Sequence, residues 1–237
     1  MTAGSSYLSD QRFFTRMAIF VSGLTIFGFA QFAARGIPDY ANAPLHIHLH
    51  GFAYLCWMVL FPVQNILAGK GSLALHRKLG WLGALLMIAM VALGSYTGIQ
   101  SIVRGHTPPH YAPAFFLPLV QLAVVAFGIL VVAAIATRRD TQWHRRLMLC
   151  ATVVLTDPAL DRLLPGPVIG GANSQWIILG IQLVLLGIVM RHDGKHLGRV
   201  HPAMWWGAGV IVATHLLTQI LARSPAVAAM AERLAAG

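Results

Sequence analysis

Histidine and aspartate pairs with metal-ligand spacing occur in the 237-residue chain. His46 and His50 are four residues apart, as are Asp157 and Asp161, so each pair shares one face if its segment is helical. Iron, copper and zinc bind imidazole and carboxylate ligands in proteins, and helical bundles commonly supply two of them from one helix. These four residues therefore predict a transition-metal site, with Asp157 and Asp161 as the candidate catalytic carboxylates.

Three further histidines belong to the same candidate metal site. His106 and His110 repeat the four-residue spacing, although the intervening Pro108 and Pro109 also fit an ordinary polar loop. His215 stands alone in a later apolar segment, where it serves either as a ligand or as a hydrogen-bonded buried histidine. For His46, His50, Asp157 and Asp161, the alternative is a histidine-rich rim at the membrane surface, with an aspartate paired to Arg162.

A second group of histidines lies beside basic residues. His76 and His144 each precede an arginine at the start of an apolar segment. Two histidines on facing helices can ligate haem b axially, and arginines can pair with its propionates. Ordinary interfacial residues are the alternative, favoured by the position of both histidines only one turn into their segments. His192 and His196 also have ligand spacing, but Gly194 between them predicts a solvent-exposed turn.

The composition predicts that these residues belong to a membrane protein. Hydrophobic residues make up 57% and charged residues 10% of the chain, whereas a soluble domain carries about 25% charged residues. These values exclude a disordered chain, a soluble enzyme and a disulfide scaffold. The net charge of +10 is spread singly between apolar runs, which favours contact with anionic lipid and argues against a nucleic-acid partner.

The apolar runs predict an all-α polytopic membrane protein with a single transmembrane domain over residues 1–237. A helix needs about 20 apolar residues to cross a bilayer. Seven helices are expected, over residues 14–34, 44–69, 76–103, 112–137, 143–164, 174–190 and 202–221. The fifth is unusual because only Leu147–Thr156 lacks ionisable residues, and Pro158 predicts a kink within it.

The basic residues predict the orientation of this bundle. Twelve of the 17 lysines and arginines fall at the N-terminus and in the second, fourth and sixth connections. Positive loops face the cytoplasm, so we expect the N-terminus inside, the C-terminus outside, and the protein in a bacterial inner membrane. This orientation places the candidate metal site near the extracytoplasmic face, and His76 and His144 near the cytoplasmic face.

Two stretches of the sequence echo each other 68 residues apart. Lys70–Leu79 reads KGSLALHRKL and Arg138–Leu147 reads RRDTQWHRRL. Two explanations of this similarity are open. The stretches belong either to related helical hairpins or to independent helix starts that converged on similar basic residues.

These stretches also carry a resemblance to known proteins. At His76-Arg77-Lys78-Leu79-Gly80 and His144-Arg145-Arg146-Leu147-Met148, the chain resembles uncharacterised bacterial multi-pass membrane proteins with His-Arg-x-Leu-Gly elements. That group is loosely similar to haem-bearing bundles of the cytochrome b561 type, which implies haem b as a cofactor. The chain departs from the b561 pattern because it lacks paired mid-helix histidines at both leaflets.

The candidate residues leave three functions open. The first is an integral membrane metalloenzyme, an oxidoreductase that acts on a small or lipid-soluble substrate. The second is a zinc hydrolase acting on a lipid-like substrate. Seven-span hydrolases related to alkaline ceramidase also use histidine and aspartate at helix ends, but the histidine pair of their last span is absent here. The third is a transporter or sensor in which Asp157, Asp161 and His215 relay protons or bind a cation.

Overall fold

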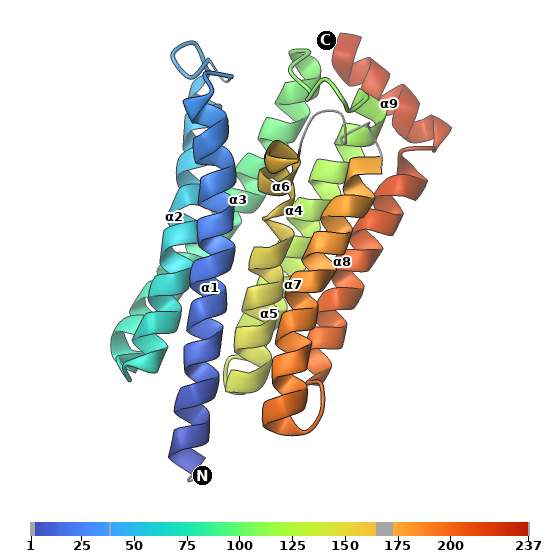
Figure 1. Ribbon diagram of the computed structural model, residues 1–237. Coiled ribbons are helices and arrows are strands. Elements are labelled where there is room, and N and C mark those ends of the chain that lie inside the picture. The colour runs from blue at the N-terminus through green and yellow to red at the C-terminus, as the bar shows by residue number, and fades with distance from the viewer. Residues whose placement is uncertain (1–2, 38, 165–172, 237) are drawn as a thin grey trace.

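The protein is a bundle of helices. The computed structural model describes residues 3–37, 39–164 and 173–236, and within these ranges nine helices and no strands occur. In chain order, as labelled in Figure 1, they are α1 (Ala3–Ala34), α2 (Leu45–Gly69), α3 (Leu73–Val103), α4 (Pro113–Ala136), α5 (Thr141–Val154), α6 (Asp157–Leu163), α7 (Asn173–Leu197), α8 (Pro202–Leu221) and α9 (Pro225–Ala236).

Six of these helices, α1, α2, α3, α4, α7 and α8, are long and apolar enough to cross a membrane. The predicted all-α fold is confirmed, and the length and composition of these six helices support the predicted membrane character. The sequence predicted the bounds of α2, α3, α4 and α8 to within three residues. Helix α1 begins well before the expected residue 14, and α9 was not predicted.

The expected fifth span is two short helices. Helix α5 ends at Val154 and α6 begins at Asp157, so neither is long enough on its own to cross a bilayer. Pro158 lies in the first turn of α6 and has no N–H to continue the ladder of α5. The kink predicted from Pro158 is confirmed.

Helix α5 lies at the centre of the bundle, where it contacts α1, α4, α7 and α8. Almost every residue from Arg145 to Val154 is buried. This central position explains the ionisable residues of the fifth segment, because its two arginines pair with acids on neighbouring helices. Arg145 forms an ion pair with Asp10 of α1, and Arg146 forms one with Asp193 of α7.

The turn predicted at Gly194 is wrong. Helix α7 continues to Leu197, and the chain turns at Gly198, whose φ is +72°. A glycine inside a helix costs only about 1 kcal/mol relative to alanine. The buried contacts of His192 with Asp10 and of Asp193 with Arg146 hold this part of α7 in place.

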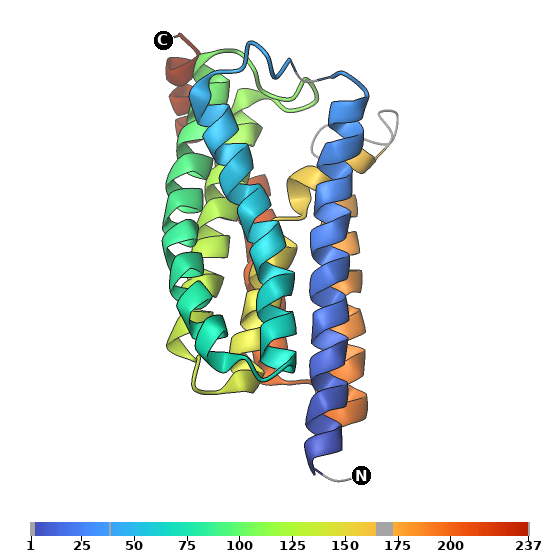
Figure 2. The same cartoon turned by 90° about the vertical axis from the view of Figure 1, so that its left-hand side faces the viewer.

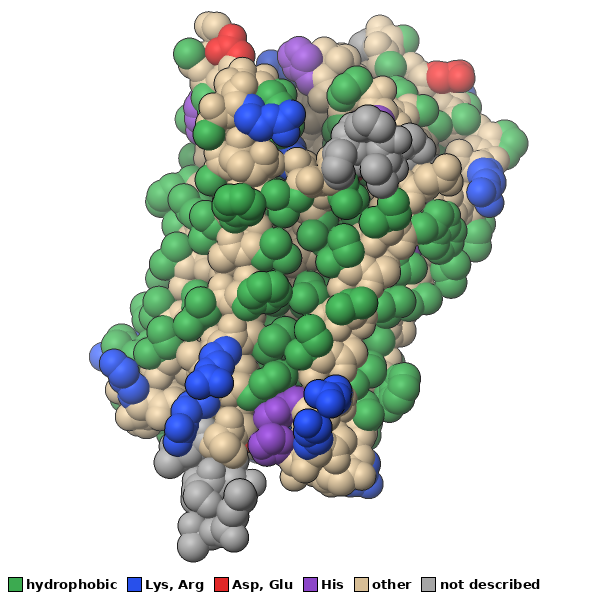
Figure 3. Space-filling model, viewed as in Figure 1, with side chains coloured by type: hydrophobic (Ala, Val, Ile, Leu, Met, Phe, Trp, Pro, Cys, Tyr) green, Lys and Arg blue, Asp and Glu red, His purple; other side chains and the backbone are tan. Residues whose placement is uncertain are grey.

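The two ends of the bundle differ in charge. We call the end where α1 begins, and where the α2–α3, α4–α5 and α7–α8 connections lie, the basic end (Figures 1 and 2). Figure 3 shows exposed hydrophobic side chains along the middle of one face, with Lys and Arg gathered toward the basic end and acidic side chains near the opposite end. The C-terminal helix α9 lies at that opposite end (Figure 1).

Candidate functional site

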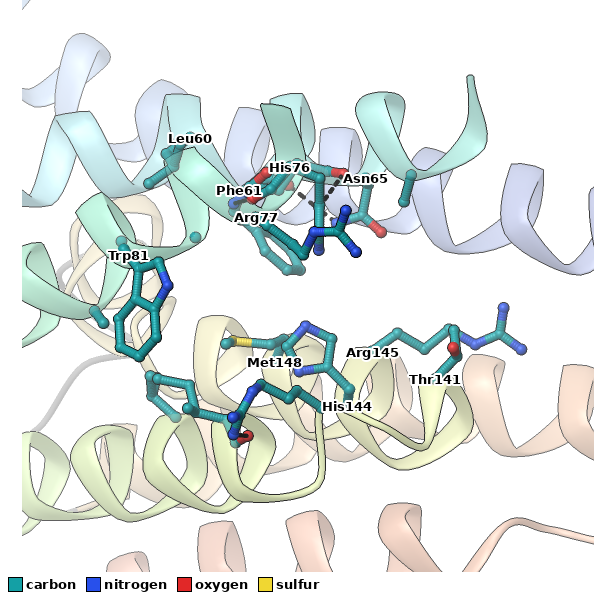
Figure 4. A pocket seen from close by; sticks show the side chains of 18 of the residues that line it. Leu60, Phe61, Asn65, His76, Arg77, Trp81, Thr141, His144, Arg145 and Met148 are labelled. Atoms are coloured by element: carbon teal, nitrogen blue, oxygen red, sulfur yellow. Dashed lines mark hydrogen bonds between the residues drawn. The ribbon is translucent and has the colours of Figure 1, made fainter. Parts of the chain in front are cut away.

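A cavity of about 530 Å³ lies at the basic end, between the α2–α3 hairpin and the start of α5 with the end of α4. Its volume is within the range of pockets that hold small molecules and cofactors. Trp57, Phe61, Trp81 and Met148 supply much of its apolar wall. Figure 4 shows the two sets of side chains facing each other across this space. We call it the histidine cavity, after the two imidazoles described next.

His76 and His144 enter the histidine cavity from opposite sides (Figure 4). Their ring centroids are 6.3 Å apart and their planes make an angle of 83°. Two imidazoles that ligate one metal ion from opposite sides, each through a metal–nitrogen bond of about 2 Å, have centroids about 6 Å apart. The separation of the two rings therefore suits a shared metal between them.

Contacts with the backbone fix which nitrogen of each ring carries the hydrogen. His76 Nδ1 lies 3.2 Å from the backbone oxygen of Gln64, and His144 Nδ1 lies 2.8 Å from that of Ala134. A carbonyl oxygen only accepts hydrogen bonds, so Nδ1 must donate in both rings, and the lone pair of a neutral ring is then on Nε2. Metal-ligating histidines are commonly oriented by this kind of outer contact.

The two histidines have equivalent surroundings in two hairpins. His76 bonds to the helix that precedes α3, and His144 to the helix that precedes α5. The resemblance between Lys70–Leu79 and Arg138–Leu147 thus corresponds to a common local structure. This favours related hairpins over a mere similarity of basic helix starts.

Four arginines also line the histidine cavity, and two of them are available to a ligand. Arg145 is paired with Asp10, and Arg138 donates to the backbone oxygen of Ile135 at 3.1 Å. Arg77 and Arg139 are exposed and form no ion pair with the acidic residues that the structure describes. Guanidinium groups in this position suit the carboxylates of haem propionates.

Haem b fits this donor set. Two imidazoles oriented by backbone contacts have ring centroids at the appropriate separation, the walls are largely apolar and aromatic, and exposed arginines lie among the lining residues. Both histidines lie near the starts of their helices, and this position favoured the interfacial alternative. The structure nevertheless brings the two rings close together.

No protein-family model, curated protein or solved structure matches the chain. The assignment of the site therefore depends on its geometry.

The two aspartates belong to a second polar region, at the opposite end of the bundle. His110 Nε2 lies 3.1 Å from both carboxylate oxygens of Asp161, and the Tyr111 hydroxyl donates to Asp161 Oδ1 at 2.9 Å. Gln175 Nε2 donates to the Tyr111 oxygen at 2.7 Å and to Asp157 Oδ1 at 3.3 Å.

This region continues toward the middle of the bundle through α8. His215 Nε2 lies 3.8 Å from Asp157 Oδ2 and 3.0 Å from Gln182 Oε1. We call the connected group the aspartate network. Its members are His110, Tyr111, Asp157, Asp161, Ser174, Gln175, Gln182 and His215.

Tyr111 remains a hydrogen-bond donor in this network. Burial raises the pKa of its hydroxyl above the ordinary value, and the nearby Asp161 carboxylate raises it further. The phenol is therefore protonated at neutral pH and gives its hydrogen to Asp161.

The other predicted metal ligands are placed elsewhere. His46 packs edge-on against Tyr96, with centroids 5.2 Å apart, and His50 stacks on Tyr54 at 4.3 Å. The side chain of His106 is exposed. The structure thus joins Asp161 to His110 and Asp157 to His215, and neither acid to the α2 histidines.

Within residues 3–37, 39–164 and 173–236, no three histidine, cysteine, aspartate or glutamate side chains converge as possible metal ligands. A catalytic zinc site uses three protein ligands and an open position. The alternative of an aspartate paired with Arg162 is not seen either. Arg162 donates to the backbone oxygen of Pro158 at 2.6 Å and lies over the ring of Phe29, 4.6 Å from its centroid.

Several residues of both regions were not predicted. Tyr111 and Gln175 connect the two aspartates, although nothing in their spacing marks them beyond a polar group beside an apolar run. Trp57 and Trp81 come together in the histidine cavity from α2 and α3. Contacts between helices of this kind have no signature in a single sequence.

Proposed function

We propose that the protein is an integral membrane haem protein of the oxidoreductase class. In this proposal His76 and His144 ligate haem b in the histidine cavity, and Arg77 and Arg139 pair with its propionates. The observation that carries it is the 6.3 Å separation of two imidazoles whose Nδ1 atoms are both bound to backbone oxygens. When bound, haem b supplies one-electron transfer.

The side chains of the chain have separate tasks in this proposal. The backbone contacts of His76 and His144 hold each ring in place before haem binds, which lowers the cost of ordering the ligands. Trp57 and Phe61 supply apolar wall and limit the access of water. Trp81 lines the cavity but is also 67% exposed, so it lies where the cavity adjoins the surface facing lipid. A small or lipid-soluble redox partner suits that position.

The proposal includes seven passes through a bacterial inner membrane, with the N-terminus inside and the C-terminus outside. Helices α5 and α6 together make the fifth pass, since they run between the two ends of the bundle (Figure 1). The basic end then faces the cytoplasm, in agreement with the distribution of Lys and Arg. Haem b lies near the cytoplasmic face.

The test is the haem content of protein purified in detergent after expression with added haem precursor. We expect one haem per chain in the unaltered protein, and a loss of at least about tenfold in His76→Ala and His144→Ala, because metal ligands contribute several kcal/mol to binding. His196→Ala is the matched control, because His196 lies at the basic end but outside the histidine cavity.

Two results would overturn the proposal. One is purified protein without haem under conditions that load other haem proteins. The other is equal haem content in the His76, His144 and His196 variants, with each variant eluting as a monodisperse species.

A further inference from the structure

The aspartate network contains two acid–imidazole pairs in series. Asp161 and His110 form the first, where the His110 side chain is 25% exposed. Asp157 and His215 form the second, where both side chains are buried. The four-residue spacing of the aspartates on α6 places each carboxylate beside a different histidine.

Asp157 is buried beside groups that offer it no permanent positive charge. Helix α7 contributes the amides of Gln175 and Gln182, and α4 contributes the apolar Leu119 and Ala123. The titratable and charged groups around it, among the described residues, are His110 and Tyr111 from the α3–α4 connection, Asp161 and Arg162 from α6, and His215 from α8. Of these, Arg162 is turned toward the aromatic rings of α1.

The hydrogen bonds of Gln182 decide the state of His215. Gln182 Nε2 donates to the backbone oxygen of Val153 at 3.2 Å and to Thr156 Oγ1 at 3.4 Å, so its Oε1 accepts. His215 Nε2 must therefore donate its hydrogen to that oxygen, 3.0 Å away. At 3.8 Å, Asp157 Oδ2 is too distant for a direct hydrogen bond with the same nitrogen.

A buried carboxylate without a compensating cation is costly in a membrane protein. A neutral imidazole beside a neutral carboxylic acid avoids the cost of two buried charges. A small cavity of about 10 Å³ adjoins Asp157, Gln182 and His215, and most of its surface is apolar.

We propose that Asp157 is a proton-binding group, whose carboxyl group is held as a neutral acid in the aspartate network. Its Oδ1 accepts a hydrogen bond from Gln175 Nε2, and the proton is held on Oδ2, the oxygen on the side of His215. Gln175 Nε2 also donates to the Tyr111 oxygen, so this amide links Asp157 to Tyr111 and Asp161 without itself passing a proton. This proposal does not depend on haem, and would stand if the histidine cavity held another ligand.

Infrared spectroscopy of the reconstituted protein tests this proposal. The chain has only seven acidic residues, so the carbonyl band of one protonated carboxylic acid can be assigned. We expect this band at neutral pH in the unaltered protein and in Asp161→Asn, and its loss in Asp157→Asn. Asp157→Glu should retain a band at a shifted frequency, which distinguishes protonation from a general effect on the fold.

His48→Gln is the control and should retain the band, since His48 is exposed on α2 and outside the aspartate network. Absence of the band at neutral pH, or its persistence in Asp157→Asn, would overturn proton binding by Asp157.

Discussion

Arg146 and Asp193 form an ion pair in which neither side chain has exposed surface. Arg146 Nε donates to Asp193 Oδ2 at 2.9 Å, and the same oxygen accepts the backbone N–H of His201 at 3.1 Å. One carboxylate thus joins α5 and α7 to the turn that precedes α8. The pair lies at the basic end, and its arginine is on α5, the helix that also carries His144.

Asp193→Asn should lower the free energy of unfolding by about 3–5 kcal/mol, because it leaves the Arg146 guanidinium buried without its counter-charge. Chemical denaturation in detergent, followed by circular dichroism, measures this change. Asp39→Asn is the control, since Asp39 is exposed and bonds to the nearby Asn42. Equal stability of the two variants would contradict a role for the pair in holding α7.

Gly28 is required where α1 crosses α6. A Cβ atom at this position would lie 2.7 Å from the backbone oxygen of Ala159, whereas one at Gly23 would have no neighbour within 4 Å. Gly28→Ala should therefore lower the thermal transition, because α1 must move away from α6. Gly23→Ala should leave it unchanged or raise it, since alanine favours the helix by about 1 kcal/mol. The opposite order of the two transitions would contradict the close crossing.

Arg77→Gln and Arg139→Gln should each lower the reduction potential of bound haem. Removal of a nearby cation disfavours the form with the additional electron. We expect a decrease of at most about 40 mV, because an exposed ion pair contributes up to about 1 kcal/mol and about 59 mV corresponds to a tenfold change for one electron. Lys78→Gln is the matched control, since Lys78 is exposed and adjacent to Arg77 but does not line the cavity. A potentiometric titration that gives the same value for all three variants would exclude the two arginines as propionate partners.

The membrane helices could be predicted because, in a chain with so little charge, long apolar runs form few structures other than membrane-spanning helices. The kink at Pro158 followed from a missing backbone donor. In contrast, the extent of α7 depends on contacts with neighbouring helices. Asp193 pairs with Arg146 of α5, and His192 pairs with Asp10 of α1. Those contacts outweigh the local tendency of Gly194 to turn, and they cannot be predicted from spacing along the chain.

The candidate sites show the same division. Spacing along a helix placed Asp157 and Asp161 correctly on one short helix, and grouped His76 with His144 through their similar surroundings in the sequence. It could not show which helices face each other. All five candidate histidines, His46, His50, His106, His110 and His215, were therefore assigned to the acids, whereas the ones that lie beside the acids are His110 and His215.

Electron paramagnetic resonance of the oxidised, haem-loaded protein tests the central proposal most directly. Two axial imidazoles give six-coordinate low-spin iron, and the angle of 83° between the planes of His76 and His144 predicts the highly anisotropic form of that signal. We expect this signal in the unaltered protein and a change to high-spin iron or loss of haem in His76→Ala. A five-coordinate high-spin signal from the unaltered protein, or no haem signal at all, would contradict ligation by this pair.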